Sequence, residues 1–204
     1  MIKSILYFIV FLSFLGCKDN EMVKRQISND TVTVLPNISA SDDIGNNKCL
    51  ANFIKFRYQI YNKKKAQLEL YFSFPIKNPD IWNLIFIDAE NSFDTNRPFL
   101  SSDLKEHFDK FFTKNFINAL LKIKAKQLFN TGKYTTPILV NDFPTTTEKY
   151  SIISEYSEID KTLTLTLYTE YYEDSVKDGE TSYSYYFELD DNCNIKFKNL
   201  KLAG

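Results

Sequence analysis

Hydrophobic and polar positions divide this 204-residue chain into three parts. A nearly unbroken apolar run extends from Ile5 to Leu15, and polar residues without a sustained apolar period follow as far as Asn47. Regular spacing of apolar residues begins after Cys49 and recurs along the rest of the chain. Because only this last part has the periodicity of packed helices and strands, we predict a single α+β globular domain over residues 48–204.

The first half of the predicted domain has helical spacing. Apolar residues recur at intervals of three and four over residues 52–62, which predicts an amphipathic helix there. A second helical stretch is expected at residues 64–71, with a break at Pro75. Residues 81–87, IWNLIFI, are apolar, β-branched and aromatic, and so predict a short buried strand, with a helical turn as the alternative.

Two more helices are predicted before the chain turns to strands. Ser101 or Ser102 is the expected N-cap of a helix over residues 101–112, because a serine hydroxyl accepts a hydrogen bond from the first turn. The next helix is expected over residues 114–132. It should end at Gly132, since glycine adopts the left-handed conformation that closes many helices.

Alternation of apolar and polar side chains with a period of two predicts strands after Tyr150. Asp178-Gly179 and Asp191-Asn192 lie between these segments, and we interpret both as hairpin turns. The pattern indicates a C-terminal antiparallel β-meander of about four strands with one polar face. The predicted strands lie within residues 151–157, 161–172, 181–190 and 194–204.

The order of elements and one loose motif resemble a known fold group. Helices followed by antiparallel strands are the order of NTF2-like and cystatin-like proteins. The residues Phe53, Phe56, Ile60 and Gln67 and the segment Phe74-Pro75-Ile76 are similar to NTF2-like domains of unknown function attached to Bacteroidetes lipoproteins. The resemblance implies N-terminal helices packed on a curved antiparallel sheet in the form of a cone, and it implies no established activity.

Residues 1–16 have the layout of a secretory signal peptide, with Lys3 before the apolar run and a small residue, Gly16, after it. The run is shorter than the ~20 residues that a membrane-spanning helix needs. Residues 14–17, Phe-Leu-Gly-Cys, resemble the lipobox of bacterial lipoproteins. This resemblance implies that Cys17 carries diacylglycerol and an acyl chain such as palmitate. The alternative is a plain signal peptide whose first mature residue happens to be cysteine.

The residues after the lipobox predict where the protein is attached. Residues 17–21, CKDNE, are similar to the export signal of surface lipoproteins in Bacteroidetes, which implies the outer membrane. The cell surface and the periplasmic face are the two alternatives. Residues 17–47 are expected to form a flexible tether with a root-mean-square span of about 30 Å. The expected membrane contact is therefore the N-terminal lipid.

Composition argues against several classes of function. The net charge is −1 and no basic stripe is present, so we expect no nucleic-acid partner. The chain has five glycines and no glycine-rich phosphate-binding motif. His107 is the only histidine, which excludes metal sites built on two histidines. We therefore predict no catalytic residue, no metal ligand and no cofactor.

Two cysteines form an even pair once Cys17 is lipidated. In an exported chain, Cys49 and Cys193 are expected to form a disulfide, with two separate thiols as the alternative. Thr31 and Ser175 each follow Asp and precede Val, a pattern that resembles the O-glycosylation site of exported Bacteroidetes proteins. A glycan at either residue would add a bulky, solubilising group.

Tyrosines concentrate in the predicted strands. A tyrosine combines a rigid apolar ring with a polar hydroxyl and is enriched at binding surfaces, although strands favour tyrosine in any case. The sequence thus predicts a binding face on the sheet. Its candidate residues are Tyr168, Tyr171, Tyr183 and Tyr185.

Three classes of function fit these features. The leading one is a noncatalytic, lipid-anchored binding or accessory domain with a protein as the expected partner. The second is an immunity- or inhibitor-type lipoprotein that neutralises a secreted toxin. Residues 142–191 would suit that role, because they contain thirteen acidic residues and three lysines. The third is an NTF2-like enzyme with an acidic residue inside the cone.

Overall fold

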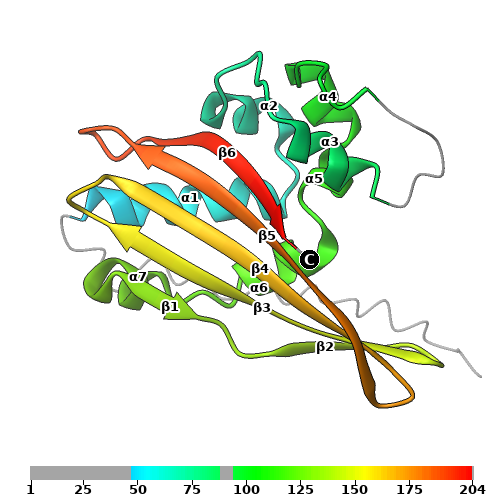
Figure 1. Ribbon diagram of the computed structural model, residues 1–204. Coiled ribbons are helices and arrows are strands. Elements are labelled where there is room, and N and C mark those ends of the chain that lie inside the picture. Colours follow the sequence, from blue (N-terminus) through cyan, green and yellow to red (C-terminus); the bar gives the residue numbers. More distant parts are fainter. Residues whose placement is uncertain (1–46, 88–93, 204) are drawn as a thin grey trace, which may run out of the picture. The chain divides into compact units, whose positions relative to one another are not determined.

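Helices pack against a six-stranded antiparallel sheet in the computed structural model, which describes residues 47–87 and 94–203 (Figure 1). The predicted α+β class is confirmed. The predicted signal peptide, Cys17 and Thr31 lie outside the described residues. No helix in the described part of the chain is long and apolar enough to cross a membrane. The helices are α1 (Lys48–Tyr61), α2 (Lys65–Leu68), the 3-10 helix η1 (Glu69–Tyr71), α3 (Pro79–Ile85), α4 (Ser101–Glu106), α5 (Phe108–Phe111), α6 (Lys114–Leu120) and α7 (Ala125–Thr131).

The strands follow the helices in the chain and lie in the order β1-β3-β4-β5-β6. Two short strands, β1 and β2, share one edge of β3, because both pair with it antiparallel. From β3 onward, each strand pairs with the next strand along the chain. The strands are β1 (Lys133–Thr135), β2 (Leu139–Asp142), β3 (Thr146–Ser157), β4 (Thr162–Glu173), β5 (Val176–Leu189) and β6 (Ile195–Ala203).

Helix α1 begins at a side-chain cap. The side-chain oxygen of Asn47 accepts a hydrogen bond of 3.0 Å from the backbone N–H of Leu50, which satisfies one free donor of the first turn. Phe53, Phe56 and Ile60 are fully buried on the face that meets the core. The predicted helix is therefore confirmed, although it begins at Lys48 rather than near residue 52.

The strand predicted for residues 81–87 is wrong, because these residues belong largely to helix α3. The side chain of Asn78 caps this helix by accepting a hydrogen bond of 2.9 Å from the N–H of Asp80. Pro79 occupies the first turn, where its fixed backbone angle favours a helix. A short apolar run fits a buried strand and a buried helix equally well. The capping residues before the run decide between them.

The two longer predicted helices are each divided in the structure. Residues 101–112 form α4 and α5, which meet at His107, and residues 114–132 form α6 and α7. Neither predicted serine is the N-cap of α4. That position is Leu100, whose backbone N–H donates a 2.7 Å hydrogen bond to the carboxylate of Asp103. The side-chain hydrogen bond at the start of α4 is therefore made by a carboxylate in the first turn of the helix, and not by a serine hydroxyl at the N-cap position.

The end of α7 agrees with its prediction. Gly132 follows the helix with a φ of 76°, in the left-handed conformation. A Cβ at this position would lie 3.1 Å from the carbonyl oxygen of Tyr156. Glycine is therefore required by the backbone angle and by the close approach of β3.

Strand faces agree with the period-two pattern, but one turn does not. Leu163, Leu165 and Leu167 of β4 are buried, whereas the threonines between them are partly exposed. The turn between β4 and β5 is Asp174-Ser175, with φ values of 46° and 68°, and the prediction of Asp178-Gly179 is wrong. Asp178-Gly179 instead lies inside β5 at a bulge. The predicted turn at Asp191-Asn192 is confirmed between β5 and β6.

Tyr185 occupies the centre of the aromatic core. Its side chain is fully buried, and its ring centroid lies 4.4 Å from that of Phe116 and 5.6 Å from that of Phe111. Its hydroxyl donates a 2.5 Å hydrogen bond to the backbone carbonyl of Phe111, at the end of α5. Burial raises the pKa of Tyr185 well above its usual range, so the hydroxyl stays protonated and remains a donor.

Replacement of Tyr185 by phenylalanine should destabilise the domain. The Phe111 carbonyl would lose its donor in a buried environment, and we expect the free energy of unfolding to fall by about 1–3 kcal/mol. Urea unfolding followed by circular dichroism measures this loss. Tyr186→Phe is the matched control, because the adjacent tyrosine is only partly buried. Equal stability of the two variants would show that the buried hydrogen bond contributes nothing.

Candidate functional site

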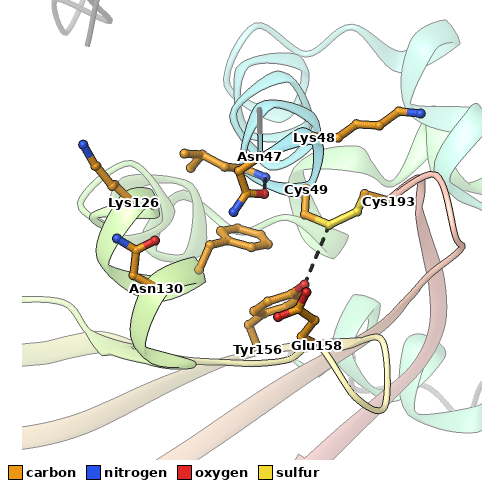
Figure 2. A pocket seen from close by; sticks show the side chains of 10 residues that line it. Asn47, Lys48, Cys49, Lys126, Asn130, Tyr156, Glu158 and Cys193 are labelled. Carbon is orange, nitrogen blue, oxygen red and sulfur yellow. Dashed lines mark hydrogen bonds between the residues drawn. A yellow bond between two sulfur atoms is a disulfide. The ribbon is translucent and has the colours of Figure 1, made fainter. Parts of the chain in front are cut away.

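An open groove of the described domain lies beside a disulfide (Figure 2). Cys49 in the first turn of α1 is bonded to Cys193 in the turn before β6, across a sequence separation of 144 residues. The structure thus contains the predicted bridge rather than two separate thiols. The groove has a volume of about 680 Å³ and lies between the start of α1, helix α7 and the end of β3. We call it the disulfide groove.

An aromatic pair and the disulfide form one wall of the disulfide groove. The rings of Phe129 and Tyr156 lie 4.5 Å apart between centroids. The hydroxyl of Tyr156 donates a hydrogen bond to Cys49 Sγ at 3.7 Å (Figure 2). Burial, and then the nearby charge of Glu158, raise the pKa of Tyr156. This tyrosine is consequently a neutral phenol at physiological pH, suited to hydrogen bonding and ring contact rather than to proton transfer.

Polar side chains surround that wall. Asn47 and Asn130 supply amides, and Glu158 supplies a carboxylate beside Tyr156 (Figure 2). Lys48 donates a 2.9 Å hydrogen bond to the side chain of Asn192. Lys126 forms no ion pair with a described residue. Amides, an aromatic wall and unneutralised charge are typical of binding sites, in which few polar groups orient a partner against an apolar surface.

The described lining of the groove contains no histidine and no free thiol. His107 lies elsewhere, with its ring 6.1 Å from that of Trp82 and 5.6 Å from that of Phe86. Its nearest acidic partner is Glu106, at 3.8 Å. Within residues 47–87 and 94–203, no three His, Cys, Asp or Glu side chains are placed to hold a metal ion.

The predicted tyrosine face is wrong as a single surface. Tyr185 is fully buried and Tyr183 is only 8 % exposed, because both belong to the inward face of β5. Tyr171 shares the alternation of the buried leucines of β4, and its hydroxyl lies 3.3 Å from that of Thr181. Tyr168 alone among the four points to the opposite face. The prediction treated tyrosines on adjacent strands as neighbours without the strand register.

A different group of side chains surrounds Tyr168 on the outward face. The Tyr168 hydroxyl donates a 2.6 Å hydrogen bond to Glu180, and the Tyr172 hydroxyl donates one of 2.9 Å to Glu170. Lys177 bridges the two carboxylates at 2.9 and 2.6 Å. We call these five residues the hairpin cluster, since all lie near the β4–β5 turn, which extends past the helices in Figure 1.

The hairpin cluster satisfies its own charges. Hydrogen bonds from Lys177 lower the pKa of both Glu170 and Glu180, and the bond to Glu180 raises the pKa of Tyr168. Each shift follows from a contact inside the cluster, so the cluster is better explained by local pairing than by catalysis. The cluster has a local pattern in the sequence, because its five residues lie on two strands that the Asp174-Ser175 turn joins.

Ser175 and two pairs of acidic residues lie at turns of the sheet. Ser175, the predicted glycosylation site, lies in the exposed β4–β5 turn, where it is accessible. The acidic pairs Glu173-Asp174 and Asp190-Asp191 also lie at turns. Asp190 accepts hydrogen bonds from the backbone N–H groups of Asn192 and Asn194, which is a structural role for its carboxylate.

No protein-family model, curated protein or solved structure matches this chain. Its function is therefore argued from its own residues.

Removal of the disulfide should destabilise the fold strongly. Replacement of Cys49 and Cys193 by serine frees a loop of 144 residues, and loop-closure entropy gives a loss of up to about 5 kcal/mol. We expect urea unfolding of the double variant to match that of the reduced native protein. Reductant should leave the double variant unchanged. Alkylation of both cysteines in the native protein without reductant would contradict the bridge.

Proposed function

We propose that this chain is a lipid-anchored cell-envelope protein whose folded domain is a noncatalytic binding or accessory module. The disulfide groove carries the proposal, because it combines an open volume of about 680 Å³ with amides, a neutral tyrosine and charged side chains. These groups provide contacts for a partner and no evident machinery for breaking a bond. An enzyme with an acidic residue in a cone is supported less well, since Asp103, the one buried acidic residue among the described residues, is paired with Arg97 at 3.0 Å.

The attachment part of the proposal rests on the first residues. The lipobox-like residues 14–17 and the following CKDNE support lipid on Cys17 and a location at the outer membrane, on the cell surface or the periplasmic face. Helix α1 begins at Lys48, so about thirty residues separate the lipid-bearing cysteine from the first helix. That length is enough to hold a binding domain clear of the lipid headgroups.

We also propose that the fold is a variant of the NTF2-like or cystatin-like cone with a C-terminal meander. Two observations support this relationship. All described helices precede the sheet in the chain, and β3 to β6 pair in consecutive order. A bulge between Tyr171 and Tyr172 interrupts the β4–β5 pairing, and a bulge of this kind increases strand twist.

A second candidate function is that of an inhibitor- or immunity-type lipoprotein. The observation that favours it is the end of the sheet that projects past the helices in Figure 1. Phe143 is 52 % exposed and Val176 is 70 % exposed there, and the N–H of Asp174 bonds to the carbonyl of Thr145 between the two hairpins. Exposed apolar side chains among acidic residues suit a basic protein partner.

Lipidation is tested by detergent partitioning. The native protein should enter the detergent-rich phase of a cloud-point separation and incorporate labelled palmitate, because two or three acyl chains give firm anchoring. Cys17→Ser should remain in the aqueous phase or accumulate uncleaved, and it should take up no label. A Cys17→Ser protein that still incorporates labelled palmitate would argue against lipid on Cys17.

Binding through the groove is tested with a charge reversal and its matched control. We expect the acyl-free domain to retain a partner from envelope or secreted fractions, and Lys126→Glu to abolish that retention. Lys122→Glu is the control, because Lys122 is an exposed lysine just before α7 that does not line the groove. Equal recovery with the two variants would remove the groove from the interaction. Turnover of a small molecule by the purified domain would sink the noncatalytic proposal.

A further inference from the structure

The two outer edges of the sheet differ in how their backbone groups are satisfied. At the β6 edge, the side chain of Asn78 donates a 2.9 Å hydrogen bond to the carbonyl of Leu200. The N–H of Leu202 donates one of 3.4 Å to the carboxylate of Asp80. Helix α3 and its cap residue therefore cover this edge, as proteins usually do where a strand would otherwise be open to pairing.

The opposite edge consists of β1 and β2 (Figure 1). On β1, the hydroxyl of Thr131 donates a 2.8 Å hydrogen bond to the carbonyl of Lys133. Strand β2 has no such cover, because it pairs only with β3 and no described residue bonds to its outer backbone groups. An open strand edge of this kind is a template for a further strand.

The strand register identifies the free backbone groups of β2. Directly after the paired stretch, the N–H of Phe143 donates a 2.8 Å hydrogen bond to the carbonyl of Thr146. Hydrogen-bonded residues alternate along antiparallel strands, so Asn141 bonds to β3. The backbone groups of its neighbours, Val140 and Asp142, therefore point outward. Each of the two offers one donor and one acceptor to an added strand.

Apolar side chains flank this free backbone. Ile138 is 66 % exposed, Val140 is 50 % exposed and Phe143 is 52 % exposed. Pro137 and Pro144 bound the segment, and since neither has a backbone N–H, they limit the free edge to the six residues between them. Six extended residues span about 20 Å. The edge therefore fits a short extended segment of a partner.

The charge at this end of the sheet favours a basic partner. Lys177 is already bonded to two glutamates, and Lys149 lies over the ring of Tyr172 at 4.2 Å. Four carboxylates nearby form no ion pair with a described residue, namely those of Asp142, Glu173, Asp174 and Asp178. A second copy of the chain would bring the same carboxylates together. The four-residue β2 would also bury far less than the ~800 Å² per partner of a stable interface.

We infer that β2 is a docking edge, to which a basic, extended segment of a partner protein adds as a further strand. The segment would exchange backbone hydrogen bonds with Val140 and Asp142, and its β-branched side chains would cover Ile138. A lysine or arginine would lie opposite Asp142. The inference rests on the proposed binding function, but β2 shares no residue with the disulfide groove, so failure of the groove proposal would leave the test at β2 unchanged.

Three synthetic peptides separate backbone pairing from charge. The first is acetyl-TVKTVTV-amide, whose lysine lies opposite Asp142 when its last two valines lie opposite Val140 and Ile138 in an antiparallel register. The second peptide has glutamate in place of the lysine. The third carries N-methyl groups on the lysine and the middle valine, the residues whose N–H groups would donate to β2. It keeps the side chains of the first peptide and loses its backbone donors.

Amide exchange followed by NMR on the isotope-labelled mature protein in detergent micelles reports on each N–H separately. With the lysine peptide, exchange at Val140 and Asp142 should slow about tenfold in a saturable manner. Exchange at Asn141, which is already bonded to β3, should not change. The glutamate peptide should bind about fivefold more weakly, and the N-methylated peptide should give no protection.

Two variants assign the contact to β2. Val140→Pro removes an N–H that bonds to no described residue, so it should abolish protection at Asp142 and leave the melting temperature nearly unchanged. Val140→Thr is the matched control, because it keeps the N–H and the β-branched shape, and it should bind like the native protein. Asp142→Lys should reverse the preference, so that the glutamate peptide binds about fivefold more tightly than the lysine peptide.

Several outcomes would overturn the inference. Absence of saturable protection at Val140 and Asp142 with millimolar lysine peptide is one, and equal binding of the N-methylated peptide is another. Protection that rises with protein concentration without any peptide would identify a second copy as the occupant. Native-like peptide affinity in Val140→Pro would place binding elsewhere on the protein. If Val140→Pro does not fold, Asp142→Lys with the two charged peptides still gives a decisive answer.

Discussion

Aromatic packing between the helices and the sheet is the interaction on which the remaining structure depends. Helices α2 to α7 are four to seven residues long, far below the ~12 residues at which an isolated helix becomes even marginally stable in water. Rings from the sheet hold them. Tyr185 packs on Phe116 of α6 at 4.4 Å, and Phe197 packs on Phe111 of α5 at 5.6 Å between centroids. The disulfide groove lies where α7, one of these short helices, and the start of α1 meet the end of β3.

Much of the fold could be predicted because its long elements have unambiguous periods. The alternation around Leu165 and the helical spacing around Phe56 specify buried faces without knowledge of the partner. Prediction failed where a short segment is decided by one side chain. Asn78 caps a helix in an apolar run whose composition favours a strand. The turn forms at Asp174-Ser175, although composition alone favours Asp178-Gly179.

The candidate sites were predicted less completely, for a physical reason. Tyr185 lies on the buried face of β5 and Tyr168 on the outward face of β4, and the tyrosine prediction combined them although the alternation within each strand separates the two faces. The disulfide groove brings together Cys49 and Cys193, 144 residues apart in the sequence, and no local pattern shows that α7 and the end of β3 also line it. The cysteine pair could be predicted, because two cysteines of an exported chain either form one disulfide or remain separate thiols.

The position of the disulfide has a mechanical consequence. Chain that reaches the domain from the N-terminal side enters at Asn47, and Cys49 is covalently bonded to Cys193 only two residues later. A pull on that chain passes through the bridge into the turn before β6, a strand that pairs along β5, and does not peel α1 turn by turn. The bridge therefore directs tension into the sheet, where many hydrogen bonds share the load, and protects the first helix from unwinding at its N-terminal end.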